Sequence, residues 1–331
     1  MSNKNILILT GAGFGKDADL PVEKEIMKLG LKACENKKPE VIEGLKNLWQ
    51  SIDPKHPIEH YSFEDLLTKI ILEEQLNKNP QRGHNIQNIK LAVLEIFLQS
   101  LKAPLSKKSP KHYVDFLDLY KDYAYFATLN YDYLIEKLLI SNKIPWTYGY
   151  NFNEINIDPN SRKFYIQGES ADFHSIFCYL KLHGSFNWHF CWRCKNTRLS
   201  KFVISGEIFS KTNRSLQACT CIFKSGQPIM QPLIVPPSAI KYYNLPIFLQ
   251  LWFEFKKIIE KVEKLIIIGC SVRDDDTMLI YILYNLYQKN PNLRKIVLID
   301  PEKTVQEKTQ DYTKMKVNRY KYLKEFLLYH R

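Results

Sequence analysis

The sequence has no apolar run long enough to cross a membrane. None of its stretches approaches the roughly 18 consecutive apolar residues that a membrane-spanning helix needs. No long apolar segment follows a basic start at the N-terminus, so we expect no secretory signal peptide. Internal repeats and low-complexity tracts are also absent. With 331 residues and 45% apolar content, the sequence predicts a cytoplasmic globular protein of one large domain or two smaller ones.

Cysteine is present in an odd number, seven, which argues against a complete set of disulfides. Four of the seven form two close pairs, Cys191-x-x-Cys194 and Cys219-x-Cys221. Such pairs are more typical of metal binding in a reducing compartment. Four thiolates would close a tetrahedral Zn²⁺ site and leave no open position, so we expect a structural role. The alternative is that some of these residues are ordinary reduced cysteines.

A dedicated nucleic-acid-binding motif is missing, although the net charge is +12. A positive charge of this size permits non-specific attraction to nucleic acid or to acidic partners. The lysines are spread widely along the chain rather than gathered in one segment. We therefore expect no more than an indirect role for nucleic acid.

A glycine-rich segment near the N-terminus is the strongest local signal. The short apolar run Ile6–Leu9 predicts a buried parallel strand, and Gly11, Gly13 and Gly15 follow at once. Such a turn can present bare backbone N–H groups to a phosphate. Lys16 stands where the common dinucleotide fingerprint has its third glycine. The alternative is a tight turn that binds nothing.

The segment after this turn predicts helices from Val22 to about Leu105. Ser62 precedes acidic residues as a helix N-cap does, and an apolar stripe runs through Ile86–Leu101. We expect a loop over Lys102–Lys111. The predicted organisation is a main domain of residues 1–21 and 112–331, with an α-helical insertion at 22–111 and a small cysteine-containing lobe at 186–229. The insertion could cover the sheet, act as a lid or form an oligomer interface.

Polar residues follow two further predicted strands. Tyr123–Thr128 is followed by Asn130 and Asp132, and Ile176–Leu182 is followed by His183. Ligands bind at the carboxyl ends of strands in open α/β sheets, so these side chains are candidate site residues. The alternative for Asn130 is a helix N-cap.

Two more buried strands are predicted near the C-terminus, Lys264–Gly269 and Lys295–Asp300. An acid at the end of such a strand, here Asp300, can accept hydrogen bonds from an adenosine ribose. The run Asp274–Asp276 predicts a cap for the helix Thr277–Lys289, which is apolar nearly all round and so should be deeply packed.

Several motifs together resemble the sirtuin (SIR2) family, and in particular the bacterial SIR2-like group of anti-phage defence systems. They occur in the family's order and are Gly11-Ala12-Gly13-Phe14, Thr128-x-Asn130-x-Asp132, Leu182-His183-Gly184-Ser185, the four cysteines, and Gly269-x-Ser271. Gly15, Asp19 and Glu23-Lys24 depart from the family's pattern. The resemblance implies a Rossmann-like, mainly parallel α/β sheet with an α-helical insertion and a small zinc-ribbon-like lobe.

The resemblance also implies roles for individual residues. Asn130 would be the catalytic asparagine and His183 the catalytic histidine, acting as general base. The cysteines Cys191, Cys194, Cys219 and Cys221 would hold structural zinc. The NAD⁺ site would include Gly11, Ala12, Gly13, Phe14, Asp132, Gly269, Ser271 and Asp300.

The function that this resemblance implies is an NAD⁺ glycohydrolase that releases nicotinamide and ADP-ribose in abortive infection. Its regulation would come from a homo-oligomer, a partner ATPase or an Argonaute-like sensor. One alternative is an NAD⁺-dependent protein deacylase, but Pro236 and Pro237 remove backbone donors that a paired peptide would use. The other is a non-catalytic nucleotide-sensing or nucleic-acid-binding module.

Overall fold

The structure is a computed structural model, and it describes residues 4–37, 39–50, 52–76, 80–106, 108–148, 177–190, 202–204, 231–235 and 246–330. The chain divides into two compact units. The first comprises Met1–Phe14, Ser109–Ile234 and Tyr243–Arg331. The second comprises Gly15–Lys108 and Val235–Tyr242.

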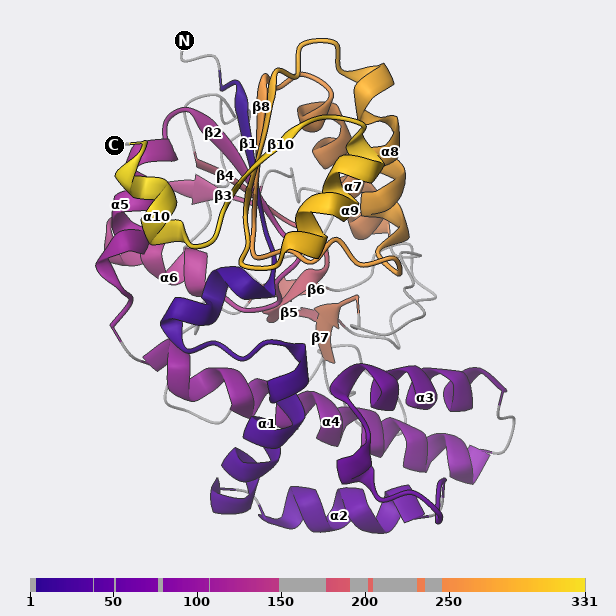
Figure 1. Ribbon diagram of the computed structural model, residues 1–331. Helices are drawn as coiled ribbons and strands as arrows, with labels where there is room; N and C mark the ends of the chain where they lie inside the picture. The colour runs from indigo at the N-terminus through magenta and orange to yellow at the C-terminus, as the bar shows by residue number, and fades with distance from the viewer. Residues whose placement is uncertain are drawn as a thin grey trace. The chain divides into compact units, whose positions relative to one another are not determined.

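The first unit is built on a seven-stranded sheet in the order β10-β9-β8-β1-β2-β4-β3, in which every pair is parallel (Figure 1). β1 lies at the point where the order reverses, because the chain first builds the sheet toward β2 and later toward β8. This confirms the predicted Rossmann-like, mainly parallel sheet. The strands are β1 (Ile6–Thr10), β2 (Ala124–Thr128), β3 (Trp146–Thr147), β4 (Phe177–Lys181), β8 (Lys264–Ile268), β9 (Lys295–Ile299) and β10 (Val317–Tyr320).

Helices cover both faces of this sheet, which explains why its strands read as unbroken apolar runs. Leu7, Ile8 and Leu9 of β1 are fully buried. In Figure 1 the helices α5, α6 and α10 lie on one side of the strands and α7, α8 and α9 on the other. Their bounds are α5 (Lys111–Tyr120), α6 (Leu134–Ser141), α7 (Pro246–Ile259), α8 (Thr277–Lys289), α9 (Lys303–Thr313) and α10 (Leu323–Leu328).

α8 departs from the prediction that it is deeply packed all round. Its buried side chains are Leu279, Ile282, Leu283 and Leu286. On the other side, Tyr281, Tyr284 and Tyr287 are each more than 60% exposed. A tyrosine ring counts as apolar in a sequence pattern, but its hydroxyl allows it to face water. α9 and β10 were not predicted as separate elements, because the basic segment after Lys303 has no continuous apolar run.

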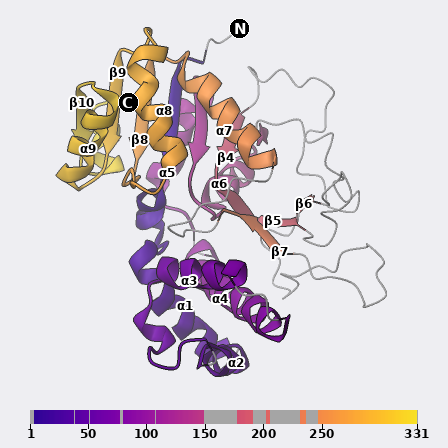
Figure 2. The ribbon, with the colours of Figure 1, turned by 90° about the vertical axis from the view of Figure 1, so that its right-hand side faces the viewer.

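A second, antiparallel sheet follows β4 closely, with the strand order β6-β5-β7. Its strands are β5 (Gly184–Phe190), β6 (Phe202–Ile204) and β7 (Gln231–Ile234). Figure 2 shows β7 beside β5, its antiparallel partner. Gly184 opens β5 with φ +80°, and a Cβ there would lie 2.2 Å from the Leu233 carbonyl oxygen. Only glycine fits this junction, which begins immediately after His183.

The described part of the second unit contains a short 3-10 helix and four α-helices. The 3-10 helix η2 (Ile58–His60) lies between α2 and α3, and another, η1 (Ala12–Ala18), begins in the first unit. The Ser62 Oγ accepts the Asp65 N–H at 3.1 Å, as the N-cap prediction requires. α4 runs through to Ser106, so the loop predicted from Lys102 begins later. The four are α1 (Glu23–Lys37), α2 (Pro39–Gln50), α3 (Phe63–Leu76) and α4 (Pro80–Ser106).

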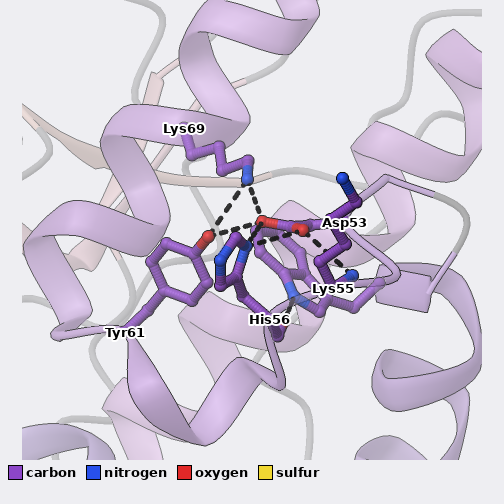
Figure 3. A network of polar contacts seen from close by, with 6 residues as sticks. Asp53, Lys55, His56, Tyr61 and Lys69 are labelled. Carbon is purple, nitrogen blue, oxygen red and sulfur yellow. Dashed lines mark hydrogen bonds and ion pairs between the residues drawn. The ribbon is translucent and has the colours of Figure 1, made fainter.

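A polar network ties the α2–α3 connection to α3 (Figure 3). The buried Asp53 carboxylate accepts hydrogen bonds from Lys69 Nζ and, at 2.5 Å, from the Tyr61 hydroxyl. His56 Nδ1 lies 3.0 Å from Asp53 Oδ1, and the Lys55 N–H donates to the same oxygen. Lys69 and Tyr61, followed by His56, hold the pKa of Asp53 well below its usual range.

None of the helices described is long and apolar enough to cross a membrane.

Candidate functional site at the carboxyl edge of the sheet

The glycine loop after β1 packs directly on the loop after β8. The Gly11 N–H donates to the Ile268 carbonyl at 2.9 Å, and the Gly13 N–H to the Gly269 carbonyl at 2.8 Å. A Cβ on Gly11 would lie 2.7 Å from Cys270 Cα, and one on Gly13 would lie 2.8 Å from Gly269 Cα. These glycines are therefore required by a crossing of two backbones at the centre of the sheet.

This crossing corrects one part of the phosphate-loop prediction. The amides of Gly11, Gly13 and Phe14 are not bare, because each donates to a main-chain carbonyl of the protein. Ala12 is exposed and begins η1. The Phe14 carbonyl accepts the Tyr113 hydroxyl, and the two rings meet edge to face at 4.9 Å. The loop is thus held on two sides, by the loop after β8 and by Tyr113.

Asn130 lies in the loop after β2 and is tied to the glycine loop. Its side-chain Nδ2 donates to the Gly11 carbonyl at 2.9 Å, and its N–H donates to Thr128 Oγ1 at 3.0 Å. It is not a helix N-cap, since α6 begins at Leu134 and Tyr133 holds the cap position. The capping alternative is therefore wrong, and the amide carbonyl of Asn130 is the atom that can accept a hydrogen bond from a ligand.

Asp132 turns the chain into α6. Its Oδ1 accepts the Leu134 N–H at 2.8 Å, an Asx turn. Burial raises the pKa of the Asp132 carboxyl, against the lowering influence of the Lys181 charge. These contacts give Asp132 a local structural role at the position where NAD⁺ binding is predicted.

His183 follows β4 and is almost fully buried, with 3% of its surface exposed. Its ring is stacked with the Tyr131 ring at a centroid distance of 6.1 Å. The centroid of the Trp252 ring lies 6.0 Å from that of His183. β2 and β4 are parallel neighbours, and Thr128 pairs with Lys181 in their register. Asn130 and His183 each come two residues after this pair, so both lie at the same edge of the sheet.

His183 has a close partner that the sequence did not predict. Asp276 Oδ1 lies 3.3 Å from His183 Nε2, and both side chains are buried. Asp276 does hold the N-cap position of α8, but its side chain makes no capping hydrogen bond. A signal in the sequence was available. Asp276 is an acid in the loop after β8, and position at the carboxyl ends of the strands was the criterion that selected Asn130 and His183.

The remaining predicted residues lie along the same edge. Gly269 has φ +55° and its N–H donates to the Ile299 carbonyl at 2.9 Å, which links the ends of β8 and β9. Ser271 is exposed in the loop after β8. Asp300 directly follows β9, and its Oδ1 accepts the Glu302 N–H at 2.9 Å. The sheet thus brings the loops after β1, β2, β4, β8 and β9 to one edge.

The predicted zinc ligands Cys191, Cys194, Cys219 and Cys221 lie outside the described residues. Within the described ranges, no group of three or more His, Cys, Asp or Glu side chains is arranged to hold a metal ion. The three cysteines of those ranges, Cys34, Cys178 and Cys270, are buried free thiols.

A family model for the SIR2-like domain matches residues 124–322. The chain belongs to the SIR2-like domain family. The matched region begins at β2 and therefore includes Asn130, His183, Asp276 and Asp300, whereas β1 and its glycine loop precede it. No curated protein matches the chain.

Solved structures of Sir2 proteins are also similar to this SIR2-like chain. One, a crystal structure of a Sir2 homologue in complex with NAD, is 16% identical with a TM-score of 0.49, and the match covers 97% of this chain and 86% of that one. Another, an ADP-ribose complex of a mutant Sir2 homologue, is 13% identical with a TM-score of 0.47, covering 93% and 90%.

Proposed function

We propose that this SIR2-like protein is an NAD⁺ glycohydrolase, which cleaves the nicotinamide N-glycosidic bond with water. The observation that carries the proposal is the placement of Asn130 and His183. They follow neighbouring parallel strands at one edge of the sheet, and His183 has a buried acid beside it. This is the edge at which open α/β sheets bind ligands. Membership of the SIR2-like family supports NAD⁺ as the substrate.

The chemistry needs few protein groups. Nicotinamide leaves as a neutral molecule, so no general acid is required, and water adds to the ribose carbon with loss of one proton. His183 takes that proton, and Asp276 holds the imidazole in a fixed orientation and stabilises its protonated form. Asn130, fixed through Gly11 by its Nδ2, orients the water or a ribose hydroxyl with its carbonyl oxygen. The products are nicotinamide, ADP-ribose and a proton.

The test is nicotinamide release from NAD⁺ by the purified full chain, beside Asn130→Ala and His183→Ala. We expect release by the wild type and its loss in both variants, with NAD⁺ binding retained. Release that survives in both variants would place the reaction elsewhere. Absence of both release and NAD⁺ binding in the wild type would overturn the proposal. Binding without release would leave an enzyme that needs activation.

We also propose that the activity serves anti-phage defence by depleting NAD⁺, under control of a homo-oligomer, a partner ATPase or an Argonaute-like sensor. An NADase that was always active would harm its own cell, so an off state is required. The experiment is cellular NAD⁺ measurement after phage infection, in cells expressing the wild type or His183→Ala. NAD⁺ loss confined to infected cells with the wild type would support the role. Equal NAD⁺ in both strains would contradict it.

A further inference from the structure

Lys181, the last residue of β4, has a fully buried ammonium group that the proposed reaction does not use. Its Nζ donates to the main-chain carbonyl of Asp132 and lies 2.9 Å from Glu136 Oε1 on α6. Glu136 is fully buried as well, and the Tyr148 hydroxyl donates to the same oxygen at 3.2 Å. The Nζ of Lys181 also lies 5.6 Å from the centre of the Tyr179 ring. One cation therefore links β4 to α6 and to the loop between β2 and α6.

The contacts of Lys181 complete a clamp on the segment that carries Asn130. On one side, Asn130 itself donates to the Gly11 carbonyl. On the other, the next two carbonyls are held by the end of β4 and by β5. The Tyr131 carbonyl accepts the Phe186 N–H at 3.2 Å, and the Asp132 carbonyl accepts Lys181 Nζ. Lys181 and Phe186 flank His183 in the sequence, so the part of the chain that carries His183 also holds the segment that carries Asn130.

The arrangement is not explained by stability alone. Removing a lysine and a glutamate from water is costly, and their attraction in the interior offsets that cost only when geometry is good. Neutral residues of similar volume are often as stable or more stable at such positions. Burial also raises the pKa of Glu136 against the pull of Lys181. Within the described residues, Glu136 Oε2 makes no hydrogen bond. A costly pair at this place is better suited to fixing one conformation of the Asn130 segment.

We propose that Lys181, neutralised by Glu136, is a positioning residue that holds the segment from Asn130 to Asp132 in register with His183. The effect of Lys181 on catalysis rests on the proposed NAD⁺ glycohydrolase function. Lys181 acts through the Asp132 main chain and does not touch the reacting atoms. Loss of its charge lets the segment move, and a displacement of about 1 Å in a reacting group can lower a rate about 100-fold.

The experiment uses the full chain with the double substitution Lys181→Met and Glu136→Gln. The pair becomes neutral at similar volume, and the new amide oxygen can still accept from the Tyr148 hydroxyl. Glu136→Gln is not made alone, because it would leave the buried Lys181 charge unpaired. The matched control is Lys69→Met with Asp53→Asn, which removes a lysine–acid pair of the helical unit. Four quantities are measured for each protein: kcat and KM for nicotinamide release, the thermal midpoint, and amide hydrogen exchange over residues 129–134.

We expect the Lys181/Glu136 variant to fold, to keep KM within about threefold, and to lose about 10- to 100-fold in kcat. Amides of residues 129–134 should exchange about 10-fold faster. The Lys69/Asp53 control should keep the wild-type kcat and the wild-type exchange rates of residues 129–134. Unchanged kcat and unchanged exchange in the folded variant would overturn the inference while leaving the NADase proposal intact. If the wild type releases no nicotinamide, the exchange measurement alone decides it, since faster exchange supports the clamp and unchanged exchange refutes it.

Discussion

His183 and Asp276 lie with Nε2 and Oδ1 3.3 Å apart, both buried at the carboxyl edge of the sheet. The two residues come from loops after β4 and β8, on opposite sides of β1. A buried carboxylate costs free energy unless a partner offsets it, and the imidazole of His183 is the ionisable group that lies beside Asp276 Oδ1. The contact places Nε2, rather than the other ring nitrogen, toward the acid.

Asp276→Asn should lower kcat for nicotinamide release by about 10- to 100-fold, because the amide no longer stabilises the protonated imidazole. NAD⁺ affinity should change by less than about threefold, since the change lies behind His183. Steady-state kinetics and NAD⁺ titration measure the two effects.

The matched control for that change is Asp274→Asn, the same substitution two residues earlier. Asp274 is exposed and bonds Lys308 and Tyr312 on α9 rather than His183. Its kcat should equal that of the wild type. Equal losses in the two variants would show that the acidic run acts on folding, not on His183.

Gly269→Ala should destabilise the protein by more than about 2 kcal/mol. Its φ is +55°, and an added Cβ would lie 2.3 Å from Gly13 C and Phe14 N. Gly44→Ala in α2 is the opposite case, because an added Cβ there meets nothing within 4 Å. It should stabilise the helical unit by about 0.5–1 kcal/mol. Denaturant unfolding gives the free energy of unfolding of each variant. Equal effects of the two substitutions would contradict the close backbone crossing at Gly269.

The Asp53 network predicts a loss of stability in acid. The pKa of Asp53 is depressed in the folded state, so its contribution is complete above the unfolded value of about 3.9. It falls as the pH drops below about 4, because the unfolded chain then binds a proton on this carboxyl while the folded network still holds the carboxylate. The thermal midpoint of the wild type should therefore exceed that of Asp53→Asn by a margin that is constant above about pH 5 and shrinks below about pH 4.

The control for the acid series is Asp118→Asn, which breaks an exposed pair with Lys121. Its midpoint should stay close to that of the wild type at every pH, because exposed pairs contribute little. A margin for Asp53→Asn that does not shrink in acid would contradict the network.

Zinc remains a prediction from the four cysteines. Purified protein should contain about one zinc ion per chain, and Cys191→Ser should abolish it. Cys34→Ser, at a buried free thiol of the helical unit, is the control and should retain the metal. Elemental analysis of the three proteins decides the matter, and zinc-free wild type would leave the cysteines as ordinary thiols.

Much of the fold could be predicted because its strands are short apolar runs bounded by polar or glycine residues. β1, β8 and β9 all have this form, and both faces of a parallel sheet are buried. β10 escaped prediction because its sequence, Val-Asn-Arg-Tyr, is polar and it forms an edge of the sheet. The exposed tyrosines of α8 misled the packing prediction because hydropathy does not separate a ring from its hydroxyl.

The sequence by itself determined which residues follow each strand, and so placed Asn130, His183 and Asp300 at the carboxyl edge. Only the tertiary structure decided their partners. It joined Asp276 to His183 and Lys181 to Glu136, and it showed that Gly11 and Gly13 serve a backbone crossing with Gly269. These contacts join residues far apart in the chain. They depend on strand order and on the small distances between packed loops, which no local pattern of residues records.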